Sequence, residues 1–259
     1  MTQIDSGRGA GDPPDEGAML SISRVERIGE SVILYDASLA GQPREAWFDP
    51  LHWDGTRVAT DRSGGRGATL FVHHDGQDWV LKHYHRGGAV ARVIDDGFCW
   101  LGGQRTRAFT EWYLLAHMHA AGLPVPRPVA ARYLRRGLVY RCDLLTVRVP
   151  GVTSLSTRLA AGALPAATWH SIGKCLARFH RARIFHADLN AHNVQLDQRD
   201  GIFLLDFDRG RVMARQDSWC RRNLERLHRS LAKISREGGA NFAPGDWAAL
   251  LEGYDDSRA

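Results

Sequence analysis

Residues 186–193 read HADLNAHN and residues 204–208 read LLDFD, and these two short stretches decide the fold of the chain. The first is a polar loop in which Asn193 follows Asp188 by five positions. The second places Asp206 at the end of an apolar run. The residues between the two stretches favour a short strand, a turn and a second strand. A carboxylate, an amide and another carboxylate therefore lie at the two ends of one predicted hairpin.

This set of polar side chains suits phosphoryl transfer from ATP. The reaction needs a carboxylate that orients the attacking hydroxyl and accepts its proton, and hard oxygen ligands for the Mg²⁺ that bridges the phosphates. The spacing is that of a kinase catalytic loop followed by a metal-binding aspartate. We therefore predict that Asp188 is catalytic and that Asn193 and Asp206 bind metal.

The alternative interpretation is that these loop residues only form turns and caps. An Asp and an Asn at this spacing are common by chance, but the whole set on the expected elements is not. For His186 the structural interpretation is the better one, because a histidine at this position more often supports the loop than takes part in chemistry. Asn190 and His192 stay open: each either meets the acceptor or caps the loop.

A second group of candidate residues lies in the first half of the chain. Gly64, Gly65 and Gly67 precede a predicted strand, and glycine lets a backbone approach phosphates closely. Lys82 lies in the following strand, from which its ammonium would neutralise the α and β phosphates. Glu111 on the next helix would pair with this lysine. The alternative for Glu111 is an ordinary solvated helix residue.

Strands predominate in the first half of the chain and helices in the second. Residues 68–84 and 128–149 favour β-hairpins, the first turning at an Asp-Gly pair. Apolar residues recur at helical spacing within 106–121 and 166–182, and a long basic helix follows. We predict an α+β, two-lobed protein-kinase-like fold, with a β-rich N-terminal lobe, a small helical C-terminal lobe and the active site in the cleft.

Composition sets the expected domain boundaries. Residues 1–17 are rich in Gly, Pro, Ser, Asp and Glu, and we expect a disordered tail. We assign residues 18–147 to a nucleotide-binding lobe and residues 148–259 to a catalytic lobe. The joining segment TVRVPG has strand-like backbone with alternating donors and acceptors. We therefore expect the Val147 carbonyl and the Val149 N–H to hold the adenine of ATP.

The formal net charge of +5 indicates either solubility alone or an anionic partner. No recognised binding motif supports nucleic acid as that partner. The sequence contains no run of about 18 apolar residues, so we expect no membrane-spanning helix. No feature indicates an obligate protein partner.

Longer stretches of the chain resemble the 3-deoxy-D-manno-octulosonic acid (Kdo) kinases, a family of lipopolysaccharide core kinases in Gram-negative bacteria. The stretches are GRGAT, DGQDWVLKHY, GLPVPRP, HADLNAHN and LLDFDRG, within a resemblance from about residue 50 to about residue 235. The resemblance implies ATP-dependent phosphorylation of the 4-hydroxyl of Kdo on the lipid A precursor. It implies a peripheral enzyme on the cytoplasmic face of the inner membrane. It also implies that Asp188 is catalytic, that Asn193 and Asp206 bind metal, and that Lys82 binds the ATP phosphates.

Two positions depart from the wider kinase pattern. Ala187 replaces the usual arginine of the catalytic loop, and Asp208 replaces the glycine of the DFG motif. Both changes favour an unregulated small-molecule kinase. The alternatives are an aminoglycoside-type or homoserine-type kinase, an atypical protein kinase and a pseudokinase scaffold. The 53 residues that follow Asp206 are few for a peptide-docking platform, and a pseudokinase has usually lost a catalytic or metal-binding side chain.

The long basic helix, near residues 219–236, has two different sides. At about 100° per residue, its basic residues fall within one narrow arc and its apolar residues lie roughly opposite. The basic residues are Arg222, Arg226, Arg229 and Lys233, and the apolar ones are Leu224, Leu227, Leu231 and Ile234. We expect the apolar side to pack on the C-terminal lobe. The basic side is either merely solvated or attracts an anionic membrane surface, at about 1 kcal/mol per charge.

Overall fold

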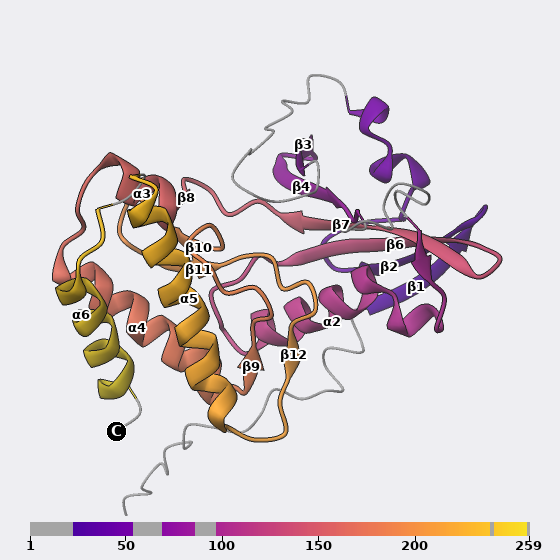
Figure 1. The fold of residues 1–259 in the computed structure, drawn as a ribbon. Coiled ribbons are helices and arrows are strands. Elements are labelled where there is room, and N and C mark those ends of the chain that lie inside the picture. Colours follow the sequence, from indigo (N-terminus) through magenta and orange to yellow (C-terminus); the bar gives the residue numbers. More distant parts are fainter. Residues whose placement is uncertain (1–22, 54–68, 86–96, 239–240, 258–259) are drawn as a thin grey trace, which may run out of the picture.

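The structure, a computed structural model, describes residues 23–53, 69–85, 97–238 and 241–257. A sheet forms the first part of the chain and helices form most of the second (Figure 1). The main sheet has seven antiparallel strands in the order β1-β2-β6-β7-β4-β3, with β5 paired to β7. Its strands are β1 (Ser23–Ile28), β2 (Ser31–Asp36), β3 (Thr69–His74), β4 (Gln77–His83), β5 (Phe98–Cys99), β6 (Pro128–Arg136) and β7 (Val139–Val147).

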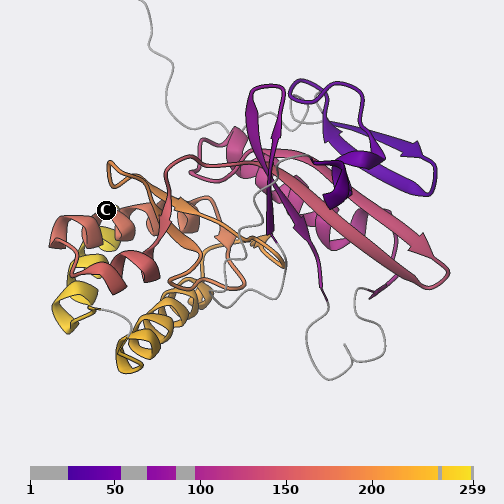
Figure 2. The same cartoon turned by 90° about the horizontal axis from the view of Figure 1, so that it is seen from above.

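The helices and short strands of the second part follow β7, and the predicted α+β fold is confirmed. They are β8 (Thr153–Ser154), α3 (Leu155–Ala161), α4 (Ala166–Arg181), β9 (Ile184–Phe185), β10 (Val194–Leu196), β11 (Ile202–Leu204), β12 (Arg211–Val212), α5 (Ser218–Arg236) and α6 (Pro244–Asp256). Figure 2 shows these helices gathered on one side of the molecule and the sheet on the other.

Turn chemistry places the two predicted hairpins. The β3–β4 turn has Asp75 and Gly76 at φ of 46° and 78°, the positive values that an Asp-Gly hairpin turn requires. The β6–β7 turn has Gly137 at φ 60°. Both hairpins are confirmed, as are the helices that periodicity predicted near 106–121 and 166–182.

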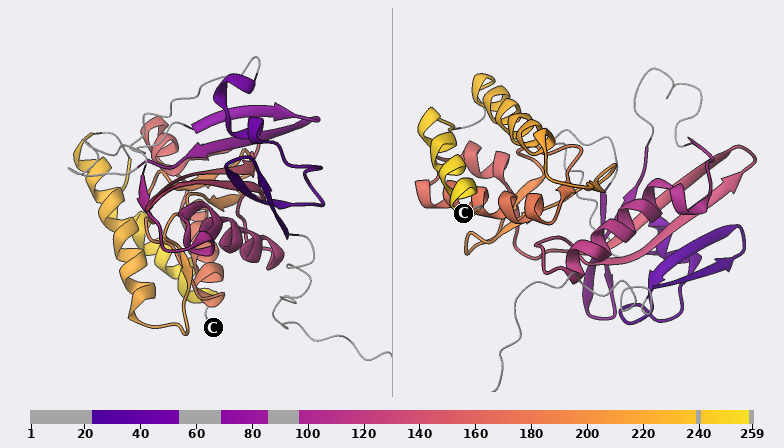
Figure 3. Two further views of the ribbon diagram at one scale, coloured as in Figure 1. Left: turned by 90° about the vertical axis from the view of Figure 1, so that its right-hand side faces the viewer. Right: turned by 90° about the horizontal axis from the view of Figure 1, so that it is seen from below.

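The core is continuous from the sheet into the helical part. Strand β2 is buried on both faces: Val32 and Leu34 belong to the main cluster, whereas Ile33 and Tyr35 belong to a smaller one. The smaller cluster also contains residues of the 3₁₀ helix η1 (Glu45–Phe48); η2 (Pro50–His52) and η4 (Gly103–Arg105) are further short 3₁₀ helices. Helix α2 (Arg107–Ala120) lies along the other face of the sheet (Figure 3) and contributes residues to the main cluster. This packing fixes α2 relative to both parts.

Three features differ from the expectation or go beyond it. The β1–β2 hairpin precedes the predicted elements and helix α6 follows them. Helices α4 and α6 touch through their backbones, since a Cβ added at Gly173 would lie 2.0 Å from the Leu250 carbonyl oxygen. The strand in the apolar run before Asp206 stops at Leu204, because Asp206 adopts a left-handed conformation with φ 61°.

Candidate active site

The polar loop between β9 and β10 is held by His186, which is 2% exposed. Its Nδ1 accepts the Asp188 N–H at 3.1 Å, so Nε2 carries the hydrogen and donates to the Leu205 carbonyl at 2.9 Å. Burial lowers the pKa of His186 despite the opposing effects of the Leu205 carbonyl and the nearby carboxylates. The histidine is therefore a neutral support that joins the two motif stretches, as the structural interpretation of its sequence position proposed.

Asn190 and His192 also make contacts within the fold. The Asn190 Oδ1 accepts the backbone N–H groups of His192 at 2.8 Å and of Asn193 at 3.1 Å. The His192 Nδ1 lies 2.8 Å from the Ser156 hydroxyl at the start of α3. Both side chains thus take the loop-stabilising role that the sequence left open.

Asn193 is oriented by the loop that it ends. Its Nδ2 donates to the Asp188 carbonyl at 2.9 Å, which leaves the amide oxygen as the end that points away from this bond. The Asn193 carbonyl in turn accepts the Leu205 N–H at 2.9 Å. The backbone of Asn193 therefore sets the position of the residue just before Asp206.

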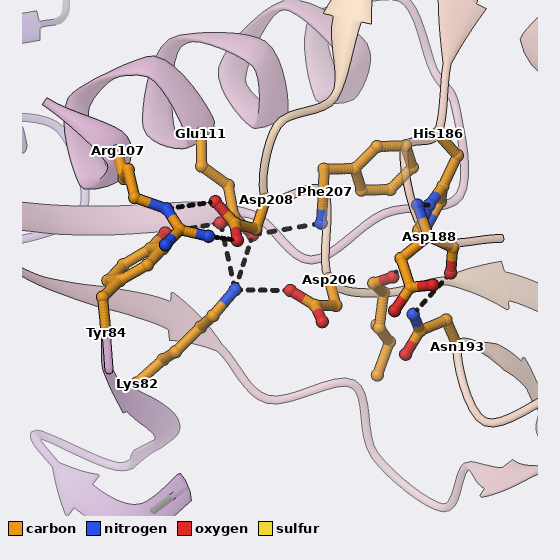
Figure 4. Close-up of polar contacts among 11 residues, drawn as sticks. Lys82, Tyr84, Arg107, Glu111, His186, Asp188, Asn193, Asp206, Phe207 and Asp208 are labelled. Atoms are coloured by element: carbon orange, nitrogen blue, oxygen red, sulfur yellow. Dashed lines mark hydrogen bonds and ion pairs between the residues drawn. The ribbon is translucent and has the colours of Figure 1, made fainter. Parts of the chain in front are cut away.

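Lys82 meets two carboxylates at the centre of the site (Figure 4). Its Nζ lies 3.0 Å from Oε2 of Glu111 and 2.5 Å from Oδ1 of Asp206. Figure 4 places Asp206 between Lys82 on one side and Asp188 and Asn193 on the other. The predicted Lys82–Glu111 pair is confirmed, and the site joins strand β4, helix α2 and the segment after β11.

The Glu111 side chain is 3% exposed, and both of its carboxylate oxygens accept hydrogen bonds. Besides Lys82, it accepts the Tyr84 hydroxyl, and its Oε1 accepts the Phe207 N–H at 3.1 Å. These contacts exclude the alternative of a solvated helix residue, because a buried carboxylate needs such partners to stay charged. The side chain fixes the lysine and the backbone beside Asp206 at the same time.

Charge pairing sets the ionisation of these groups. Burial alone would lower the pKa of Lys82, but the carboxylates of Glu111 and Asp206 outweigh it and raise that pKa. Burial alone would raise the pKa of Asp206, but the Lys82 ammonium outweighs it and lowers that pKa. Burial, followed by the nearby Glu111 charge, raises the pKa of Tyr84 well above its usual value. The lysine and the aspartate are charged at neutral pH, and the tyrosine is a hydrogen-bond donor.

The segment that joins the two parts contains the residues predicted to hold adenine. The Val147 N–H donates to the Arg127 carbonyl and the Arg148 N–H to the Asp78 carbonyl, both at 2.8 Å. Within the described ranges, the Val149 N–H has no hydrogen-bond partner. Strand pairing places Leu144, three residues before Val147, opposite Lys82. The predicted phosphate-contacting residues Gly64, Gly65 and Gly67 lie outside the described residues.

Two arginines contact this site, and sequence reasoning assigned neither to it. Arg107 binds Asp208 with Nε 2.8 Å from Oδ1 and with a second contact through Nη2. It lies one turn before Glu111 on α2, a spacing that indicates a shared helix face. Arg226 binds Asp188 with Nε 3.1 Å from Oδ1 and a second contact from Nη2.

The Arg226 contact refines the expectation for the basic helix. Among the four residues of its basic side, Arg226 lies nearest the buried side of α5, so it reaches the catalytic loop and is not merely solvated. The apolar side is confirmed: Leu224, Leu227 and Leu231 are buried and Ile234 packs against the same cluster.

The donor set suits a hard divalent cation. Asn193 and Asp206 bring an amide oxygen and a carboxylate to neighbouring positions, and Mg²⁺ is commonly bound by one or two such protein ligands with phosphates and water. In the described part of the chain, no group of three or more His, Cys, Asp or Glu residues is arranged to hold a metal.

Comparison with known proteins gives consistent matches. Residues 52–254 match the family model described as "Lipopolysaccharide kinase (Kdo/WaaP) family". A 3-deoxy-D-manno-octulosonic acid kinase of Stenotrophomonas maltophilia (strain K279a) is 42% identical over 231 residues, which cover 89% of this chain and 92% of the relative. The protein of the same name from Xylella fastidiosa (strain 9a5c) is 41% identical over 226 residues, 87% of this chain and 90% of the relative.

Proposed function

Because the chain belongs to the lipopolysaccharide kinase (Kdo/WaaP) family, we propose that it is an ATP-dependent Kdo kinase. It transfers the γ-phosphoryl group of ATP to the 4-hydroxyl of a Kdo sugar on the lipid A precursor. The observation that carries the proposal is the meeting of Lys82, Glu111 and Asp206 beside the loop that holds Asp188 and Asn193. This arrangement supports a site in which phosphate-binding, metal-binding and proton-accepting groups act together.

Asp188 acts on the acceptor. Its half-exposed carboxylate orients the Kdo hydroxyl and accepts its proton as the oxygen bonds to the γ-phosphorus. The bond between that phosphorus and the oxygen bridging to the β-phosphate breaks, and ADP leaves. His186 and Asn193 fix the loop backbone on either side of Asp188, which keeps its carboxylate in place.

The nucleotide is held from the sheet side. Lys82 exchanges its contact with Asp206 for the α and β phosphates, while Glu111 keeps its ammonium in position. The Val147 carbonyl and the Val149 N–H bind the adenine, and Gly64, Gly65 and Gly67 approach the phosphates. Asn193 and Asp206 would hold Mg²⁺, which supplies neutralisation of the phosphate charge when it is bound. The boundary between residues 18–147 and 148–259 then separates the two sides of the site.

The acceptor also implies a location. Among the described residues, no helix has the length and the apolar character that crossing a bilayer requires. We place the protein at the cytoplasmic face of the inner membrane, attached peripherally, because its acceptor would be a lipid there. The relatives' names favour this acceptor over an aminoglycoside or a protein.

Product analysis tests the proposal. The purified protein is incubated with ATP, Mg²⁺ and Kdo-bearing lipid A precursor, and parallel reactions contain an aminoglycoside or a peptide. Mass spectrometry and NMR should locate one new phosphate on the 4-hydroxyl of Kdo and none on the other acceptors. Phosphorylation of the aminoglycoside or the peptide, with the Kdo lipid unmodified, would overturn the proposal.

A further inference from the structure

Helix α5 lies against the catalytic loop through one polar stripe. Asn223 is 2% exposed, and its Nδ2 donates to the His186 carbonyl at 2.7 Å. The Ser230 hydroxyl accepts the Ala191 N–H at 3.2 Å. Arg226 lies between these residues at helical spacing and binds Asp188. Asn223 and Ser230 hold backbone groups, so they position the helix, and Arg226 is the member of the stripe that touches the catalytic side chain.

Stability does not account for the Arg226–Asp188 pair. The two side chains are 47% and 51% exposed, and pairs this exposed contribute little to folding because water screens them. A cation on the catalytic carboxylate also competes with the hydroxyl proton for the same oxygen lone pairs. The contact is therefore better suited to a state in which the arginine has a second anionic partner.

The chemistry of the proposed acceptor provides that partner. The relatives are named for a sugar acid, whose carboxyl group is ionised at neutral pH. Both hydrogen bonds from Arg226 to Asp188 end on Oδ1, so Oδ2 and the Nη1 end of the guanidinium are outside the pair. An arginine offers five N–H donors in a planar fork that matches a carboxylate. One side chain can thus hold the acid group while Asp188 meets the hydroxyl.

We propose that Arg226 binds the carboxylate of the acceptor sugar and thereby selects an acid and sets which hydroxyl reaches Asp188. This inference rests on the proposed function and adds to it the residue that determines acceptor specificity. Arg226 is a binding residue for the acceptor in this assignment, whereas Asn223 and Ser230 are positioning residues.

The test compares free Kdo with its C1 carboxamide, which has the same hydroxyls and no charge. Steady-state kinetics at saturating MgATP are measured for the wild-type protein, Arg226→Gln, Arg226→Lys and the control Arg221→Gln. Arg221 lies on the same helix, is 86% exposed and pairs with Glu225. Its substitution therefore removes one positive charge from α5 at a position that does not contact Asp188. Thermal unfolding of each variant verifies folding.

The wild-type protein should prefer the acid through its KM. Arg226→Gln should raise the KM for the acid about 10- to 100-fold, the range for a charge-assisted hydrogen bond, and leave the KM for the carboxamide nearly unchanged. Arg226→Lys should keep part of the preference, and Arg221→Gln all of it.

Two results would overturn the inference while leaving the proposed function intact. The first is an equal loss of kcat on both acceptors in Arg226→Gln, since this means that Arg226 only orients Asp188. The second is an unchanged acid preference. Absence of wild-type turnover on Kdo and on the Kdo lipid would instead refute the proposed function, and the inference with it.

Discussion

Arg107 and Asp208 form a forked ion pair that ties the first turn of α2 to the segment after Asp206. Both side chains are about one-fifth exposed, at 20% and 22%. The Arg107 guanidinium also lies over the Phe98 ring, 4.8 Å from its centre. Because Phe207 is held by Glu111 on the same helix, α2 fixes this segment at two points. The aspartate in place of the usual glycine therefore ties this segment to α2.

Breaking this tie should cost both stability and activity. Arg107→Gln and Asp208→Asn should each lower the free energy of unfolding by roughly 1–3 kcal/mol, between the values for exposed and buried pairs. Each should also lower kcat, because Asp206 loses its fixed orientation. Urea unfolding of both single variants and the double variant measures the coupling. Strictly additive losses would show that the two residues act independently.

Asp188→Ala should nearly abolish turnover while nucleotide binding persists. Loss of the group that orients the hydroxyl and accepts its proton typically costs about 10²–10⁴-fold in rate. Isothermal titration with MgATP and a turnover assay give the two quantities separately. Asp256→Ala is a suitable control, since this aspartate pairs with His170 between α4 and α6. Wild-type turnover in Asp188→Ala would refute the role of the loop.

Asp206→Asn should weaken the metal-dependent part of nucleotide affinity as well as turnover. An amide is a poorer ligand than a carboxylate for a hard cation, and the substitution also removes the negative partner of Lys82. Titration of ATP with and without Mg²⁺ onto both proteins separates these effects. An equal enhancement by Mg²⁺ in the wild-type protein and the variant would exclude Asp206 as a ligand.

His186 should make the protein sensitive to mild acid. Burial lowers its pKa in the folded state, so below its ordinary value of about 6.5 the unfolded chain binds more protons than the folded one. The contribution of His186 to the free energy of unfolding is thus fully present above the ordinary pKa. It is lost as the pH falls from the ordinary pKa through the lower pKa of the folded state. The free energy of unfolding should fall more steeply between pH 7 and pH 5.5 in the wild-type protein than in His186→Asn. Parallel curves would contradict a neutral buried His186.

The residues on the basic side of α5 other than Arg226 are the proposed membrane contact; they are Arg222, Arg229 and Lys233. With Arg226 assigned to the active site, Arg222→Glu combined with Arg229→Glu should reduce binding to anionic vesicles and activity on lipid-bound acceptor, with little change on soluble Kdo. Added salt should weaken wild-type binding. The control is Arg24→Glu combined with Arg27→Glu, which makes the same change of charge at exposed positions of β1 in the other lobe. Equal losses on soluble and lipid-bound acceptors would contradict the membrane role.

Local spacing alone was enough for much of the site. Asp188 and Asn193 are separated by a fixed loop, and Asp206 follows after a hairpin, so their proximity is encoded within about 20 residues of chain. The Asp-Gly turn, the apolar periods of α2 and α4, and the lysine strand likewise depend on local backbone and side-chain preferences. The Lys82–Glu111 pair was predictable because its order along the chain follows the kinase pattern.

Packing decided the rest. Arg226 is 38 residues from Asp188 in the sequence. The residue pattern of α5 showed only that Arg226 is one of four cations on one side of the helix. The way in which α5 is rotated and positioned against the catalytic loop brings Arg226 to the Asp188 carboxylate. The partner of Asp208 depended in the same way on how α2 crosses the sheet, 101 residues away. Helix α6 packs where it does because its backbone contacts α4 at Gly173, and this close approach requires a residue without a side chain. Side chains from distant segments meet only when whole elements pack, and no local preference specifies that geometry.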